Sequence, residues 1–186
     1  DGRKIDFLIQ RRILMKKVLR GFFITIMVFI LTSANAFAMP YNPNEYTSVD
    51  LPSEILPPSI KISKTHEGAT ARGDFFIGAD LIIKDNGNGD VGVFAKAYMS
   101  IPVDEVYITI YLDRWDADAE RWRQVTYYDA EFYAKDYPDG LTDPTVDITF
   151  LNQKKGYDYR LRGVFAAVHN GLFEGFSPVT AGIRIE

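Results

Sequence analysis

An alternation of apolar and polar residues dominates the chain from residue 72 onward. Its clearest stretch is residues 106–112, where every second residue is aliphatic. Successive side chains of a strand point to opposite faces of a sheet, so this alternation predicts a half-buried strand. Turn residues separate several such stretches. Together they predict strands at residues 75–83, 91–99, 106–112, 122–132, 146–150, 157–167 and 179–185.

Seven short strands joined by turns favour an all-β fold, a single antiparallel β-sandwich over residues 72–186. The polar positions of each strand are expected on the outer faces of the sheets, and the apolar positions between them. This parity places six side chains in the core: Ile108, Ile110, Leu112, Ile148, Tyr157 and Leu161.

Residues 15–38 have the layout of a bacterial secretory signal peptide with a short apolar helix. A basic opening precedes an apolar run over residues 21–31, and the small residues Ala36 and Ala38 precede a predicted cleavage between Ala38 and Met39. A retained membrane anchor is the alternative. A spanning helix needs about 20 predominantly apolar residues, so the shorter run favours cleavage.

Two segments flank the signal peptide. Residues 1–14 do not fit a secretory signal, and we expect them to be an upstream extension foreign to the native protein. Residues 39–71 contain five prolines and no sustained periodicity. Proline fixes φ and removes a backbone donor, so we expect this Pro-rich lead-in to be extended, and ordered only where it docks on the domain.

The charge balance excludes some partners. The chain carries 21 Lys and Arg and 25 Asp and Glu, of which residues 1–38 hold seven and two. Residues 39–186 therefore keep 14 basic and 23 acidic residues, a net charge of −9. So acidic a domain is a poor ligand for nucleic acid or an anionic membrane, and basic surfaces or cations suit it better.

Four aromatic rings are the predicted ligand-binding residues: Trp115, Trp122, Tyr127 and Tyr128. Tyr127 and Tyr128 are adjacent and must point to opposite faces, so one core cannot hold all four rings. Exposed rings stack on sugars or anchor protein interfaces. Cross-strand packing that only stabilises the sheet is the alternative.

Three carboxylates are the predicted metal ligands: Asp116, Asp118 and Glu120. They alternate between the third and fourth predicted strands, and residues two apart in a strand share a face. The alternative is a solvated, charged hairpin tip that blunts the sheet edge.

No catalytic residue is predicted. The chain has no cysteine, and its two histidines accompany no serine nucleophile motif, phosphate-binding loop or dinucleotide fingerprint. We expect a protein that is not an enzyme and needs no cofactor. A glycosidase-like carboxylate pair stays open, because acidic residues are numerous.

Residues 151–163 resemble the stretch that leads into the sixth strand of fibronectin type III domains. There a leucine precedes a corner tyrosine by six residues, as Leu151 precedes Tyr157 here. The resemblance implies a fibronectin III- or immunoglobulin-like sandwich. It also implies that the Tyr157 hydroxyl bonds to the backbone near Leu151.

A second resemblance rests on features spread along the chain: Arg72-Gly73, the 86–89 turn, residues 106–112, Trp122 and residues 159–163. With these, the whole chain resembles small secreted proteins of unknown function from anaerobic Gram-positive bacteria. That resemblance implies a compartment and a fold, but no activity.

The expected protein is a secreted, extracellular and monomeric β-sandwich without enzymatic activity. We expect it to be a binding or interaction module at the bacterial cell envelope or outside it, with a protein or glycan partner. A carbohydrate-binding or adhesive module that uses exposed aromatic rings is the alternative, and a small hydrolase is a third. Nucleic acid is not an expected partner, and membrane contact is expected only transiently, through the signal peptide.

Overall fold

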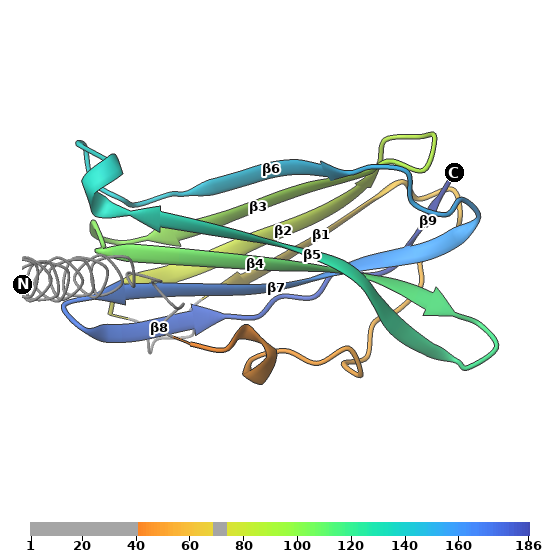
Figure 1. Ribbon diagram of the computed structural model, residues 1–186, viewed down its shortest axis with the longest axis horizontal. Coiled ribbons are helices and arrows are strands. Elements are labelled where there is room, and N and C mark those ends of the chain that lie inside the picture. Colours follow the sequence, from red (N-terminus) through yellow and green to blue (C-terminus); the bar gives the residue numbers. More distant parts are fainter. Residues whose placement is uncertain (1–40, 69–73) are drawn as a thin grey trace, which may run out of the picture. The chain divides into compact units, whose positions relative to one another are not determined.

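The computed structural model describes residues 41–68 and 74–186 (Figure 1). Residues Tyr41–Glu186 form one compact unit. The expected extension 1–14, the signal peptide 15–38 with its helix, and the cleavage position between Ala38 and Met39 lie outside the described residues.

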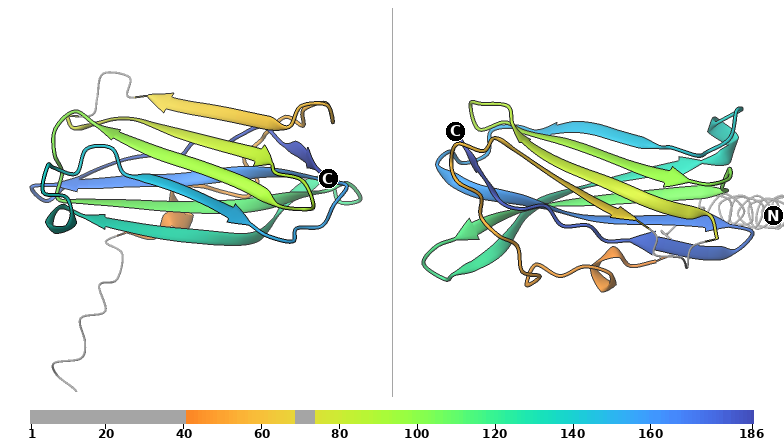
Figure 2. Two further views of the ribbon diagram at one scale, coloured as in Figure 1. Left: turned by 90° about the horizontal axis from the view of Figure 1, so that it is seen from above. Right: turned by 180° about the vertical axis from the view of Figure 1, so that it is seen from behind.

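The described residues form an all-β fold of two antiparallel sheets that pack face to face as a β-sandwich (Figures 1 and 2). One sheet has the strand order β1-β2-β3-β6, and the other has the order β5-β4-β7-β8, with β9 pairing with β7. The strands are β1 (Ile62–Gly68), β2 (Phe76–Asp85), β3 (Val91–Met99), β4 (Glu105–Asp116), β5 (Arg121–Tyr133), β6 (Thr145–Phe150), β7 (Tyr157–His169), β8 (Leu172–Phe176) and β9 (Ile183–Ile185). Two short 3-10 turns, η1 (Pro43–Glu45) and η2 (Ala134–Asp136), complete the elements.

The strands of the described residues differ from the seven predicted ones in three places. β1 lies within the expected lead-in, so the sheet begins before the boundary predicted at residue 72. β8 was not predicted. The last predicted strand, 179–185, is shortened to β9, preceded by an isolated bridge between Val179 and Arg162.

The core lies between the two sheets and is built from the apolar parity of their strands. Ile108, Ile110, Leu112 and Leu161 are fully buried, as predicted. Ile148 is partly buried and packs against the same cluster. Each buried aliphatic side chain of this kind stabilises the fold by about 1.5–3 kcal/mol.

The prediction for Tyr157 is wrong. Its side chain is 44% exposed, because it stands at the outer end of β7. The corner belongs to Tyr159, two residues later, which is fully buried and donates a 3.0 Å hydrogen bond from its hydroxyl to the Lys154 carbonyl. The two tyrosines have the same parity, so the error is one of position along the strand.

Residues 41–51 of the lead-in dock on the outer face of the five-stranded sheet (orange in Figure 1). The Tyr111 hydroxyl donates to Asn44 Oδ1 at 3.0 Å. Farther along, Gly182 N–H donates to the Glu54 carbonyl, and Leu56 N–H donates to the Gly182 carbonyl, both at 2.8 Å. Outward-facing side chains of β4 are therefore buried, with Tyr111 only 3% exposed.

Candidate functional site

The outer face of the five-stranded sheet carries three of the four predicted ligand-binding rings. Trp115 of β4 and Trp122 of β5 are cross-strand partners whose rings meet edge to face, with centroids 5.3 Å apart. Tyr127 pairs with Tyr111 on the same face, at a centroid distance of 6.1 Å. The structure thus brings Trp115, Trp122 and Tyr127 to one face.

These rings differ in exposure. Tyr127 is 57% exposed and Trp115 is half-buried, whereas Trp122 is only 5% exposed. Tyr127 and Trp115 can meet a partner, while the buried rings of Tyr111 and Trp122 pack against them, respectively.

Tyr128 does not join the other three. It is the cross-strand partner of Ile110, whose side chain lies in the core, so it points to the opposite face of the sheet from Tyr127. Because β5 is an edge strand, Tyr128 stays 40% exposed there.

Beside the aromatic rings, the same face holds a buried cluster of charges that the sequence analysis did not predict. Asp113 of β4 lies between Arg160 and Arg162 of β7, and all three side chains are at least 97% buried. Arg162 binds Asp113 with two nitrogens, Nε to Oδ2 at 2.7 Å and Nη2 to Oδ1 at 3.1 Å. Arg160 Nε reaches Oδ2 at 3.1 Å.

Gln124 of β5 accepts from Arg162 Nη2 at 3.1 Å, and the lead-in supplies further acceptors of this cluster. Arg160 Nη1 donates to the Leu51 carbonyl at 2.5 Å, and Nη2 donates to the Val49 carbonyl at 2.7 Å. Burial lowers the pKa of Arg160, while the charge of Asp113 opposes that change. Two cations buried with one anion need such neutral acceptors, so docking of the lead-in completes the cluster.

The guanidinium groups also hold the rings in place. Arg160 lies over the Trp122 ring at 4.6 Å from its centroid, and Arg162 lies over the Tyr111 ring at the same distance. Both geometries are those of cation–π contacts. The edge of the Trp122 ring also packs so closely on Gly182 that a Cβ there would lie 2.6 Å from the ring.

A second aromatic cluster lies at the other end of the lead-in contact. Tyr41 meets Tyr46, Tyr107 and Phe173 with centroid distances of 5.6, 6.0 and 5.3 Å. Tyr46 and Phe173 are 48% and 39% exposed. The lead-in, β4 and β8 contribute to this cluster, so no local sequence pattern predicts it.

The structure does not gather the three predicted metal ligands around one point. Asp116 accepts hydrogen bonds from Arg123 Nε and from the Ala119 N–H, and the bond from Arg123 lowers its pKa. Asp118 and Glu120 are exposed on the hairpin turn. Over residues 41–68 and 74–186, no three His, Cys, Asp or Glu side chains cluster as a metal site.

The outer face of the four-stranded sheet carries one polar constellation. Asp80 of β2, whose side chain is 9% exposed, accepts from the Tyr98 hydroxyl at 2.8 Å and lies 2.7 Å from His66 Nδ1. Lys64 Nζ is 3.1 Å away. Burial raises the pKa of Asp80, but these hydrogen bonds outweigh it and lower the pKa below its ordinary value. The arrangement stabilises a carboxylate but presents no nucleophile.

No protein-family model matches the chain, and a search of curated proteins finds no match. Within the described part of the chain, none of the helical segments has the length and apolar character needed to span a membrane.

Proposed function

We propose that this chain is the precursor of a secreted β-sandwich that acts, without enzymatic activity, as a binding module at the bacterial cell envelope or outside it. The observation that carries the proposal is that exposed aromatic rings lie on a layer of buried, well-packed side chains. Tyr127 is 57% exposed and Trp115 half-buried on a face whose deeper layer is Trp122 and the Asp113–Arg160–Arg162 cluster.

A few aromatic anchors carry most of the energy of a binding surface, and they do so best when they are ordered before the partner arrives. Trp115 is ordered by Trp122, which is itself held between Arg160 and Gly182. The partner therefore meets rings that lose little conformational freedom on binding.

Glycans are the alternative partner class, in a carbohydrate-binding or adhesive module. Trp115 and Tyr127 lie on one face and come from neighbouring strands, so their rings offer apolar platforms to sugar faces. A basic protein partner is also compatible with the acidic domain, which has a net charge of −9 over residues 39–186.

The hydrolase alternative is less favoured, because the carboxylates on and beside this face are already engaged. Asp113 binds two arginines, Asp116 accepts from Arg123, and Asp129 accepts from the Thr109 hydroxyl at 2.7 Å. Glycoside hydrolysis needs one carboxyl that can donate a proton and a second that is free to attack or to activate water.

We further propose that the sandwich is fibronectin III- or immunoglobulin-like, as in the small secreted proteins that the chain resembles. The order of β2–β8 supports this: β2-β3-β6 faces β5-β4-β7-β8, so the chain crosses between sheets after β3, β5 and β6. The hydrogen bond from Tyr159 to Lys154 at the start of β7 supports it too. Export is supported by the signal-like residues 15–38 alone.

Binding of the full chain to a glycan array, and to extracts of cell-envelope proteins resolved on a blot, tests the proposal. Trp115→Ala and Tyr127→Ala should each weaken binding about tenfold or more without changing the melting temperature much. Tyr128→Ala is the matched control, because its ring is exposed on the opposite face.

Equal binding by all three variants would show that this face is not the binding surface. Turnover of chromogenic glycosides by the wild type would instead support the hydrolase alternative.

A further inference from the structure

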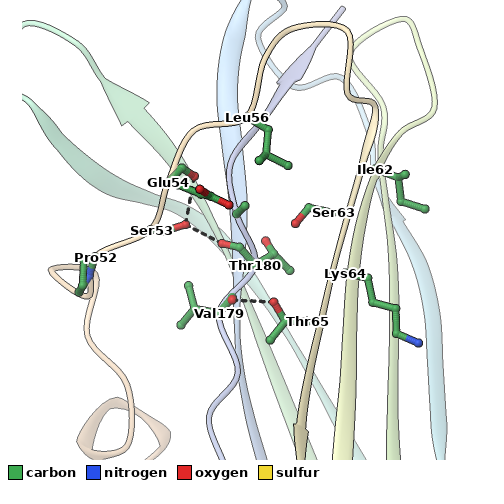
Figure 3. A pocket seen from close by; sticks show the side chains of 11 residues that line it. Pro52, Ser53, Glu54, Leu56, Ile62, Ser63, Lys64, Thr65, Val179 and Thr180 are labelled. Atoms are coloured by element: carbon green, nitrogen blue, oxygen red, sulfur yellow. Dashed lines mark hydrogen bonds between the residues drawn. The ribbon is translucent and has the colours of Figure 1, made fainter.

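A cavity of about 460 Å³ opens between the two sheets at the edge formed by β1 (Figure 3). Its walls are residues 52–56 of the lead-in, residues 62–65 of β1 and the segment 179–181. Ligand sites are typically 300–1,000 Å³, so this volume suits a small ligand or a short peptide. It is separate from the aromatic face, the outer surface of β4 and β5 that carries Trp115 and Tyr127.

The hydroxyl of Ser63 is the unusual group in this cavity. Ser63 is 7% exposed and its side chain points into the space between the lead-in and β1 (Figure 3). Its hydroxyl has no hydrogen-bond partner among residues 41–68 and 74–186, whereas the Ser53 and Thr65 hydroxyls donate to the Thr180 and Val179 carbonyls. The oxygen is reachable from the cavity, so an occupant of the cavity, water or ligand, can bond to it.

The second feature is the free edge of β1. Among the strands of residues 41–68 and 74–186, it pairs only with β2. The Lys61 carbonyl accepts from the Asp85 N–H at 2.8 Å, which fixes the alternation of the ladder. Backbone groups of residues 61, 63 and 65 point to β2, and those of Ile62 and Lys64 point away from it. The cavity thus has a free backbone N–H and C=O of Lys64 beside the Ser63 hydroxyl.

The charge at the rim of the cavity indicates what kind of ligand would fit. Lys64 is already paired with Asp80 at 3.1 Å. Glu54, on the opposite wall, is exposed and forms no ion pair with any residue of the described ranges. The rim therefore presents an uncompensated negative charge, on a domain that is acidic as a whole.

We propose that this cavity binds an extended peptide segment of another protein, about four residues long, which adds as a strand to the free edge of β1 and places a basic side chain against Glu54. The length follows from residues 62–65, since a strand rises about 3.3 Å per residue. Strand addition draws affinity from main-chain hydrogen bonds and specificity from alternate side chains. The Ser63 hydroxyl binds a polar group on the inward side of that peptide.

A phage library of linear heptapeptides, selected on the immobilised full chain, supplies the probes. The enriched peptides should carry Lys or Arg in excess and bind with dissociation constants that calorimetry can measure. Ser63→Ala should weaken them about threefold to tenfold, the effect of one neutral hydrogen bond. Glu54→Gln should weaken the basic peptides selectively. Ser59→Ala, exposed and outside the cavity, is the matched control.

N-methylation of the peptide distinguishes strand addition from mere contact. Only alternate amides of an added strand face β1, so methylating one set should abolish binding and methylating the other should leave it nearly unchanged. Trp115→Ala should bind the peptides normally, which keeps this test separate from that of the aromatic face.

Several outcomes would overturn the proposal: no enriched peptide, equal binding by Ser63→Ala, no excess of basic residues, or equal effects of both methylation sets. Concentration-dependent dimerisation through β1 would assign the edge to a second copy of the chain and would also overturn it.

Discussion

The Tyr159 hydroxyl donates a 3.0 Å hydrogen bond to the backbone carbonyl of Lys154, five residues earlier. The tyrosine is fully buried, and the bond ties the loop before β7 to the strand. The buried hydroxyl finds its acceptor in this loop carbonyl, and burial raises the pKa of the phenol.

Tyr159→Phe should lower the free energy of unfolding by about 0.5–1.5 kcal/mol, because the Lys154 carbonyl loses its donor while the ring still fills its place. Chemical denaturation measures the change. Tyr157→Phe is the matched control, since Tyr157 is 44% exposed, and it should be nearly neutral. If Tyr157→Phe is the costlier change, the corner has been placed at the wrong tyrosine.

Tyr157 and Tyr159 also show how much of this strand the sequence can predict. The alternation in residues 157–167 predicts a strand and its inward parity, both of which the structure confirms. The position of the corner depended on counting six residues from Leu151, and Leu151 is 60% exposed and does not hold the loop. Parity is a local property of a strand, whereas the corner depends on which carbonyl the folded loop presents.

The sequence does not predict strand β1, for a different physical reason. Its inward-facing residues are Ser63, Thr65 and Glu67, so it has no apolar alternation. They face the 177–181 segment, where Thr65 donates to the Val179 carbonyl and Glu67 accepts from the Ser177 N–H. A strand whose inward-facing side chains are polar and form hydrogen bonds has no hydrophobic alternation from which it could be predicted.

The sequence does not predict the buried cluster of Asp113, Arg160 and Arg162, because the positions of these residues in the alternation indicate a solvent-exposed face. Arg160 and Arg162 alternate with apolar residues in β7, which is typical of an exposed face. Docking of the lead-in, far away in sequence, covers them. The sequence does contain one signal for this cluster. The two arginines are spaced two residues apart in a long apolar strand, and Asp113 directly follows the predicted strand 106–112.

Gly182→Ala should destabilise the fold by about 1–3 kcal/mol, because the new Cβ would lie 2.6 Å from the Trp122 ring and force it to move. The tryptophan emission spectrum should change together with the denaturation midpoint. Ala181→Ser, at the partly exposed neighbouring position, should leave both nearly unchanged. An unchanged spectrum in Gly182→Ala would contradict the close contact of Trp122 with this backbone.

The Asp80 carboxylate should make the stability depend on pH in the acidic range. Hydrogen bonds from Tyr98, His66 and Lys64 hold its pKa below the ordinary value. Its contribution is complete above the pKa of the unfolded carboxyl, about 3.9, and is lost as the pH falls through the lower folded value. Asp80→Asn should therefore lose less stability than the wild type between about pH 5 and pH 3.

Urea denaturation across that range measures the difference. Asp147→Asn, exposed on β6, should follow the wild-type curve. Parallel curves for Asp80→Asn and the wild type would mean that Asp80 has the same pKa in the folded and unfolded chain.

Asp113→Asn should cost about 3 kcal/mol or more, since it leaves two buried guanidinium groups without their anion. Asp118→Asn, on the exposed hairpin turn, should stay within about 0.5 kcal/mol of the wild type. Urea is the suitable denaturant, because it leaves the ionic strength unchanged. A small effect at Asp113 would show that water reaches the cluster.

Arg160→Met should loosen the lead-in while leaving the two sheets folded. Arg160 is the side chain that donates to the Val49 and Leu51 carbonyls, and methionine can replace its apolar stem but not those bonds. The amides of Leu56 and Gly182, which bond across the lead-in contact, should then exchange hydrogen faster. Amides in the centre of β4 should keep their wild-type rates.

Arg123→Met is the matched control, because Arg123 is exposed and bonds to Asp116 rather than to the lead-in. Hydrogen–deuterium exchange followed by mass spectrometry resolves the three regions. Faster exchange confined to residues 47–56 and to Gly182 would establish Arg160 as the anchor of the lead-in. Uniformly faster exchange would instead make Arg160 a general support of the sheet. Unchanged exchange would show that the backbone bonds at Glu54 and Leu56 hold the segment without it.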